Sequence, residues 1–124
     1  ETRQGVENAD ALAALPGVDC LWIGHFDLSC ALGIPGQFDH RDFGDAVKAV
    51  TRACRKHGKA LGRLVPTVDE AVALHQAGFD FLCYSGDVWA LQGAVKAGLD
   101  EIRARTAGKA KGKDPSKRSK SKKK

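Results

Sequence analysis

Short, largely apolar runs alternate along this chain with longer stretches that have helical periodicity. The runs cover residues 20–24, 60–65 and 79–84, and each is closed by glycine, proline or a Ser-Gly pair. The first run is unbroken, which is typical of a strand buried on both faces, and strands that alternate with helices form parallel sheets. We therefore expect consecutive βα units, in which the residues that follow each strand lie at one edge of the sheet.

The segments between these runs carry helix signals. Residues 42–57 have the clearest amphipathic pattern, with Gly58 in place to end the helix. Thr67 and Glu70 fit a capping box at the start of another helix. The expected helices and helical turns are 6–15, 27–32, 42–57, 67–76 and 88–105, the last capped by Asp87.

These elements predict an α/β fold. Three complete βα units, preceded by the end of a further strand at residue 1, make about half of a closed (β/α)8 barrel. The alternative is an independent open sheet of four strands. We favour the half-barrel because each strand ends in a potential site residue on the same rim, although it leaves open strand edges and an exposed inner face.

Length and composition fit one domain. The 124 residues are 43% hydrophobic and contain no stretch that could span a bilayer and no N-terminal signal pattern, so we expect a cytoplasmic protein without a membrane partner. The four cysteines lack metal-ligand spacing, and Cys20 and Cys83 are expected to be buried. Because there is no methionine, even at position 1, we interpret the chain as a fragment or an incomplete gene model.

The basic character is confined to the end of the chain. Residues 107–124 hold nine Lys or Arg and one Asp, a net charge of +8, whereas the whole chain carries +5. We expect a disordered Lys-rich tail after a folded domain at 1–106. A nucleic-acid-associated protein is one hypothesis, but the tail has no aromatic residue to stack on bases, so no specific nucleic-acid partner is expected.

Glu1 and Asp27 are candidate metal ligands. Asp27 follows the first apolar run in the order Gly24-His-Phe-Asp27, and Glu1 stands one βα unit earlier, so the two are expected at neighbouring strand ends. Two carboxylates with room for water suit a hard divalent cation. The alternatives are a helix N-cap for Asp27 and an exposed terminal residue for Glu1.

These residues stand in an order that resembles the C-terminal half of the HpcH/HpaI aldolase family. The resemblance extends from Glu1 to about Arg105. It rests on the segments Glu1-Thr-Arg, Gly24-His-Phe-Asp-Leu-Ser29, Ala31-Leu-Gly33, Gly58-Lys-Ala60 and Gly78-Phe-Asp-Phe81. It implies half of a (β/α)8 TIM barrel of the phosphoenolpyruvate/pyruvate-binding type and the activity of a class II, metal-dependent pyruvate aldolase.

The resemblance also implies roles for particular residues. Glu1 and Asp27 would bind Mg²⁺, Mn²⁺ or Co²⁺, the backbone around Gly24, Phe26 and Asp27 would hold the substrate carboxylate, and Leu64 would line the pyruvate pocket. The reaction would be aldol cleavage of a 4-hydroxy-2-oxo (2-keto-3-deoxy) acid to pyruvate and an aldehyde. The family's catalytic base and arginine belong to the N-terminal half, so we expect no catalytic residue here and no turnover by the chain alone.

Histidines offer no alternative catalytic group in this interpretation. His25 stands where the family usually has proline and is expected to be a rim residue, while His40 and His57 are expected to be solvated. A non-catalytic remnant or binding module with a weak metal and keto-acid site is the second hypothesis, and turnover would separate it from the first. The resemblance further implies a homo-oligomer of the full-length parent.

Overall fold

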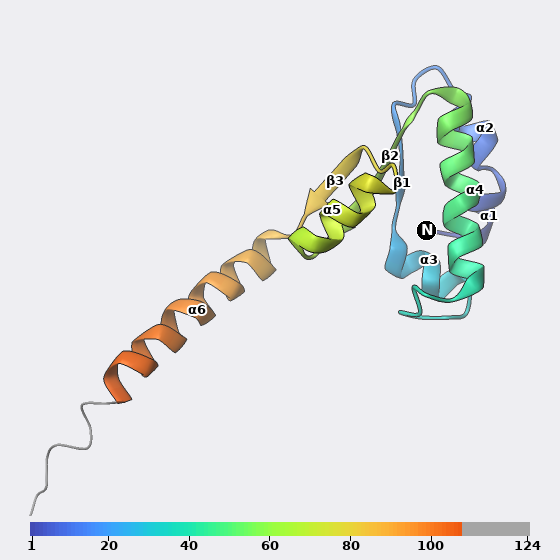
Figure 1. Cartoon of the computed structure of the whole chain (residues 1–124). Helices are drawn as coiled ribbons and strands as arrows, with labels where there is room; N and C mark the ends of the chain where they lie inside the picture. Colours follow the sequence, from blue (N-terminus) through green and yellow to red (C-terminus); the bar gives the residue numbers. More distant parts are fainter. Residues whose placement is uncertain (108–124) are drawn as a thin grey trace, which may run out of the picture. The chain divides into compact units, whose positions relative to one another are not determined.

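The computed structural model describes residues 1–107, which divide into two compact units, Glu1–Ser85 and a second that begins at Gly86. Figure 1 labels the elements along the chain. In order they are α1 (Arg3–Glu7), α2 (Ala9–Ala13), β1 (Cys20–Ile23), α3 (His25–Ala31), α4 (Arg41–His57), β2 (Ala60–Val65), α5 (Val68–Gln76), β3 (Phe81–Tyr84) and α6 (Asp87–Ala107).

The first unit is built on a parallel sheet in the order β1-β2-β3, which confirms the α/β class. The register places Trp22 beside Gly62 and Gly62 beside Phe81. The expected strand end at residue 1 is wrong, because Glu1 and Thr2 belong to no strand and the sheet has three strands in the described part of the chain. A strand is defined by its ladder partner, and these two residues have none.

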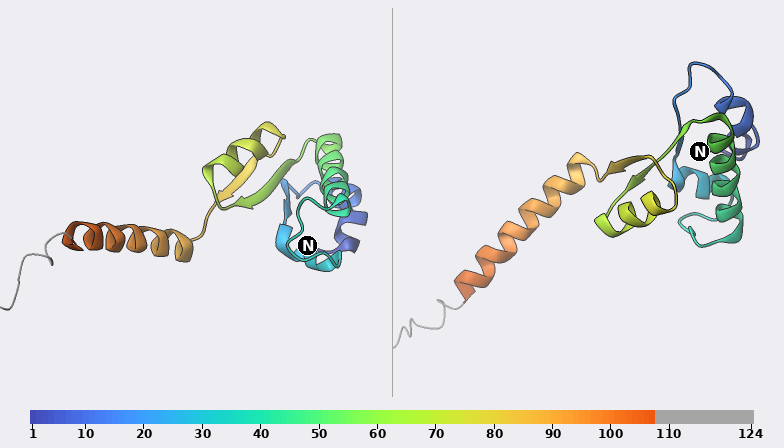
Figure 2. Two further views of the ribbon diagram at one scale, coloured as in Figure 1. Left: turned by 60° about the horizontal axis from the view of Figure 1, so that its bottom comes forward. Right: turned by 45° about the horizontal axis from the view of Figure 1, so that its top comes forward.

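The core lies between the sheet and the helices α1, α2 and α4, and two views in Figure 2 show α4 next to α1 and α2. The expected apolar face of α4 is confirmed, since Phe43, Val50 and Cys54 are all at most 7% exposed. Full burial of a side chain such as Phe43 contributes about 1.5–3 kcal/mol. The members of the core are Ala9, Ala13, Ile23, Leu28, Phe43, Ala46, Val50, Ala53, Cys54, Leu61 and Phe79.

Two of the expected helix caps are confirmed. Gly58 ends α4 in the left-handed region, at φ 63°, and Lys59 N–H donates to the Cys54 carbonyl at 2.9 Å. Thr67 Oγ1 accepts from Glu70 N–H at 3.2 Å at the start of α5. The second half of the capping box does not form, because the Glu70 carboxylate accepts from Arg63 instead, at 2.8 Å.

Three element boundaries differ from expectation for local reasons. The expected helix 6–15 is two short helices, and the first begins early because Thr2 Oγ1 caps Gly5 N–H at 3.0 Å. Helix α3 begins at His25, with Gly24 as its N-cap. Strand β3 begins at Phe81, which is its first residue with a ladder partner on β2, namely Gly62.

The sheet is buried on one face only, which corrects two expectations. Trp22 is 41% exposed, so β1 is not buried on both faces, and Cys83 is exposed rather than buried. Phe81, on the same face as Trp22, is also exposed, at 55%. Among the described residues no layer covers the face formed by Trp22, Gly62 and Phe81, whereas the alternate positions Leu61 and Val65 face the helices and are buried.

The second unit contains α6. None of its residues is buried, and its large apolar side chains are 46–67% exposed. They are Val88, Trp89, Leu91, Val95, Leu99 and Ile102. No helix within residues 1–107 is long and apolar enough to cross a membrane.

The basic tail expected at 107–124 lies outside the described residues, except for Ala107, which is the last residue of α6. The division at 106/107 therefore stays a prediction.

Candidate metal and substrate site

The side chains of Glu1 and Asp27 meet at Gly24, at the point where β1 passes into α3. A β-carbon placed on Gly24 would lie 3.1 Å from Glu1 Oε1 and 3.3 Å from Asp27 Oδ2. Glu1 Oε1 and Asp27 Oδ2 thus lie on the same side of Gly24. The distance between the two oxygens cannot exceed the sum of these two distances. The structure therefore brings together the two residues predicted to bind a metal, although Asp27 lies in the first turn of α3 and not at the strand end.

Asp27 does not cap a helix. The N-cap of α3 is Gly24, no side-chain hydrogen bond caps this helix, and Asp27 is its third residue. Nor does the carboxylate of Asp27 make a hydrogen bond or an ion pair with any residue in the described range. The alternative of an N-cap is therefore wrong, and the Asp27 carboxylate is exposed and available to a ligand.

The turn at Gly24 also presents main-chain donors. Leu28 N–H donates to the Gly24 carbonyl at 2.8 Å and is the first amide of α3 with an acceptor inside the helix. The amides of the three residues before it, His25 to Asp27, have no such acceptor, as is usual in the first turn of a helix. Phe26, whose amide was predicted to help bind substrate, has a side chain that is 57% exposed.

Leu64 lies next to this turn on the neighbouring strand. Ile23 pairs with Arg63, so Leu64 stands beside the position at which Gly24 leaves the sheet. Alternation along β2 puts Leu64 on the uncovered face, together with Gly62. Its side chain is half-buried, which leaves part of it free to line a pocket.

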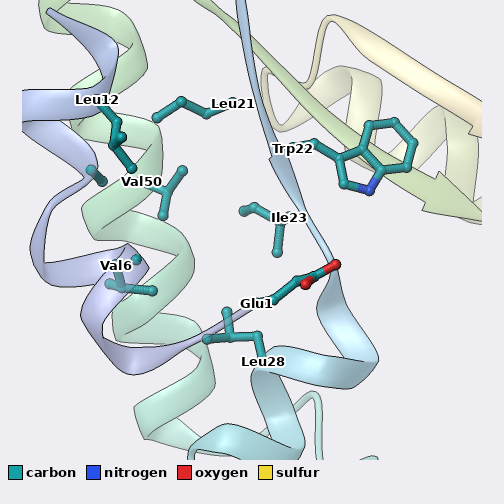
Figure 3. Close-up of a pocket in the computed structure, with 10 residues that line it drawn as sticks. Glu1, Val6, Leu12, Leu21, Trp22, Ile23, Leu28 and Val50 are labelled. Carbon is teal, nitrogen blue, oxygen red and sulfur yellow. The ribbon is translucent and has the colours of Figure 1, made fainter.

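A pocket of about 120 Å³ lies behind Glu1, between β1 and the helices α1, α2 and α4. Figure 3 shows the Glu1 side chain extended, with its aliphatic part beside Leu28 and its carboxylate at the turn after β1. Apart from Glu1 the labelled lining is apolar. It consists of Val6, Leu12, Leu21, Trp22, Ile23, Leu28 and Val50.

A second group of side chains surrounds the first residue of α3. The His25 ring lies 5.2 Å from the Phe38 ring, and the Arg63 guanidinium lies 5.6 Å from the centre of that ring. Burial lowers the pKa of His25, and Arg63 lowers it further, against the opposite effects of Glu70 and Asp27. His25 is thus favoured in its neutral form, and it packs against an aromatic ring rather than standing on an open rim.

Sequence reasoning missed Arg63 and Phe38. Burial lowers the pKa of Arg63, which Glu70 opposes, and the ion pair between them is 2.8 Å long. The available signal was an arginine inside an otherwise apolar strand, which requires a buried partner.

Of two other histidines, His40 is exposed as expected, whereas His57 differs from expectation. His40 Nδ1 accepts from Asp42 N–H at 3.1 Å and caps α4. His57 Nε2 lies 3.0 Å from Asp10 Oδ1, so it joins the end of α4 to α2 instead of being solvated. Neither lies at the turn that holds Asp27. No group of three or more His, Cys, Asp or Glu side chains able to hold a metal occurs within the part of the chain that the structure covers.

Known proteins share this sequence and fold. The family model for HpcH/HpaI aldolase/citrate lyase matches residues 1–91. The 5-keto-4-deoxy-D-glucarate aldolase of Shigella boydii is 34% identical over 103 residues, which are 83% of this chain and 40% of the relative. The hydroxypyruvate/pyruvate aldolase of Paraburkholderia phytofirmans is 35% identical over 104 residues, which are 84% of this chain and 40% of the relative.

A solved structure agrees with the sequence relatives. An HpcH/HpaI aldolase/citrate lyase family protein of Burkholderia cenocepacia is 35% identical and superposes with a TM-score of 0.77, over 83% of this chain and 40% of that one. The chain spans about 40% of the length of these relatives. The matched residues include the turn at Gly24 and both carboxylates, and the chain belongs to the HpcH/HpaI aldolase/citrate lyase family.

Proposed function

We propose that this chain is the C-terminal half of a (β/α)8 barrel and carries the metal-binding part of a divalent-metal-dependent aldolase. The reaction is cleavage of a 4-hydroxy-2-oxo acid to pyruvate and an aldehyde. The observation that carries this proposal is the meeting of the Glu1 and Asp27 carboxylates at Gly24.

The residues at this turn fit a hard divalent cation such as Mg²⁺, Mn²⁺ or Co²⁺. Glu1 and Asp27 supply oxygen ligands, which these cations prefer, and neither carboxylate has another partner within residues 1–107. Glycine at position 24 lets the Glu1 side chain lie beside Asp27, since a β-carbon there would approach Glu1 Cγ to 2.6 Å. When bound, the cation would supply Lewis-acid stabilisation of the negative charge that develops on the keto oxygen.

The chain's own groups would hold the substrate beside these ligands. The free amides in the first turn of α3, around Phe26 and Asp27, are suited to a carboxylate, since they are donors without an acceptor inside the helix. Leu64 would form an apolar wall next to the methyl or methylene group of the pyruvate part. These groups would bind and orient the substrate, and none of them would transfer a proton.

Turnover would need residues beyond this chain. The resemblance assigns the base and the arginine to the N-terminal half of the barrel, and the relatives are aldolases of which this chain spans about 40%. We therefore infer that the chain alone binds metal weakly and has no aldolase activity. The open edge of β1 and the apolar pocket beside it fit a preceding strand of such a barrel.

A second copy of the chain is the partner that we propose for α6. Its apolar side chains at 88, 91, 95, 99 and 102 repeat at intervals of three and four residues and form one stripe along the helix. All five are at least 46% exposed. A stripe of this kind is stabilised when it packs against another apolar surface, as in a homo-oligomer.

Manganese binding to the 124-residue chain tests the metal site directly. Electron paramagnetic resonance measures free Mn²⁺, and we expect Asp27→Asn and Glu1→Gln each to weaken binding at least about tenfold. Asp39→Asn and Glu7→Gln remove the same charges from exposed positions and should leave the affinity unchanged. Equal affinity in the wild type and in Asp27→Asn would contradict the proposed site.

A further inference from the structure

The two buried polar side chains among residues 1–107 hold the same loop. They are Ser29, which is fully buried, and Arg63, which is 9% exposed. The loop is residues 32–40, between α3 and α4, and will be called the α3–α4 loop. Burial of a polar group is unfavourable unless the group makes specific hydrogen bonds or contacts. That both side chains contact the same loop therefore suggests a common role.

Ser29 fixes the near end of the α3–α4 loop to α3. Its Oγ accepts from Gly36 N–H at 2.9 Å and donates to the Phe26 carbonyl at 2.6 Å. Its main-chain carbonyl accepts from Ile34 N–H at 2.9 Å. One buried hydroxyl thus joins the loop to the peptide unit that immediately precedes Asp27.

Arg63 holds the far end of the loop through Phe38. The guanidinium lies 5.6 Å from the centre of the Phe38 ring, in the range of a cation–π contact, and its ion pair with Glu70 fixes it there. The Phe38 ring packs on His25, the first residue of α3, at 5.2 Å and on Phe43 at 5.4 Å. Arg63 is therefore linked to the first residue of α3 through the Phe38 ring.

The buried position of Arg63 is unfavourable in itself. Its Nε has no hydrogen-bond partner, and an apolar side chain would fill such a site without the desolvation of a charge. The guanidinium instead places a positive charge over the Phe38 ring, 5.6 Å from its centre, which an aliphatic side chain does not. The arrangement is better explained by orientation of Phe38 than by stability.

We propose that Ser29 and Arg63 are positioning residues for the metal ligand Asp27. Acting through Gly36 and Phe38, they clamp the first turn of α3 from both ends of the α3–α4 loop and keep the Asp27 carboxylate turned toward Gly24 and Glu1. Neither residue contacts the ligand oxygens. This inference rests on the metal site proposed above.

The test separates positioning from general stability. Phe38→Leu keeps an apolar side chain but removes the ring faces that contact His25 and Arg63, and Phe38→Tyr keeps the ring. We expect Phe38→Leu and Ser29→Ala each to weaken Mn²⁺ binding to the 124-residue chain about tenfold, as residues that orient metal ligands typically do. Phe38→Tyr should restore affinity close to that of the wild type. Leu15→Ala, an exposed apolar position, is the matched control.

All variants are compared at a temperature at which circular dichroism shows wild-type helix content. If Phe38→Leu does not reach it, Arg63→Gln replaces it, since glutamine keeps a hydrogen-bond donor for Glu70 and loses the charge over the Phe38 ring. Suppose that the folded loop variants bind Mn²⁺ with unchanged affinity while Asp27→Asn has lost Mn²⁺ binding. This result would overturn the positioning role of Ser29 and Arg63 and would leave the proposed metal site standing. Retention of Mn²⁺ by Asp27→Asn would contradict the proposed metal site, and the positioning role of Ser29 and Arg63 would fall with it.

Discussion

The side chain of Glu1 occupies the space that a β-carbon on Gly24 would need, since that carbon would come within 2.6 Å of Glu1 Cγ. Gly24 has φ −72°, which any residue adopts without strain. The close approach of Glu1, and not the backbone conformation, therefore favours glycine at this position. Substitution here tests whether Glu1 must lie where the structure places it.

We expect Gly24→Ala to displace Glu1 from Asp27 and to weaken Mn²⁺ binding about tenfold without loss of helix content. Titration followed by electron paramagnetic resonance measures the affinity, and far-UV circular dichroism measures the helix content. Gly17→Ala is the matched control, because nothing lies within 4 Å of its added methyl group. Unchanged affinity in Gly24→Ala would show that Glu1 is free to move without consequence for metal binding.

Activity is tested in a chimera that supplies the N-terminal half of the proposed barrel. Residues 1–106 replace the matching part of the Paraburkholderia phytofirmans aldolase, to which the chain is 35% identical. In an active chimera we expect Asp27→Asn to lower kcat/KM for aldol cleavage about a thousandfold, because charge on the keto oxygen loses its stabilisation. Asparagine keeps the shape of the side chain, so the melting temperature should hold. Asp39→Asn is the control, and full activity in Asp27→Asn would contradict the assignment.

Asp10 gives the stability of the first unit a defined pH dependence. Hydrogen bonds from Lys56 at 2.9 Å and from His57 at 3.0 Å lower the pKa of Asp10 below its usual 3.8. The folded state thus favours the carboxylate, so this contribution is present above pH 3.8 and is lost as the pH falls through the lower folded pKa.

We expect Asp10→Asn to lower the melting temperature slightly near neutral pH, since exposed ion pairs contribute little. The difference from the wild type should vanish well below pH 3.8. Thermal denaturation over a pH series measures it, with Asp39→Asn as the control. A constant difference at every pH would mean that the hydrogen bonds to Asp10 are not its source.

The exposed apolar side chains predict self-association of the chain. Size-exclusion chromatography with light scattering should give a mass above the 13.2 kDa of the monomer. Leu91→Glu with Leu99→Glu places charges in the apolar stripe of α6 and should reduce the mass. Ala90→Glu with Ala97→Glu adds the same charges to the opposite side of the helix and should not. A compact, stable monomer of the wild type would count against both the half-barrel and the oligomer.

Local signals in the sequence were sufficient for much of the fold. The bounds of β2 and the apolar face of α4 were predicted from short-range patterns, and so was the left-handed cap at Gly58, because each depends on residues within a few positions. The start of β3 was missed, because it depends on where the chain first pairs with β2, which is at Gly62. Strand ends depend on partners that no local pattern identifies.

In the candidate site, too, some contacts were predicted from the sequence and others were not. The approach of Glu1 to Asp27 was predicted, although Glu1 follows no strand in the described part of the chain and Asp27 lies in the first turn of α3. The contact of Arg63 with Phe38 was not, because it joins a strand to an irregular loop that has no periodicity. The diversion of Glu70 from its capping box to Arg63 was missed for the same reason, since two acceptable partners compete for one carboxylate.

The row Trp22, Gly62 and Phe81 crosses the three strands side by side, and the two rings contact edge to face at 5.5 Å. A β-carbon on Gly62 would lie 2.8 Å from Trp22 and 3.1 Å from Phe81, so the middle strand has no room for a side chain. The side chains at these three positions therefore compete for the same space. In any descendant of this chain, a larger residue at 62 must be matched by a smaller ring or none at 22 or 81, so these positions should vary together rather than one at a time.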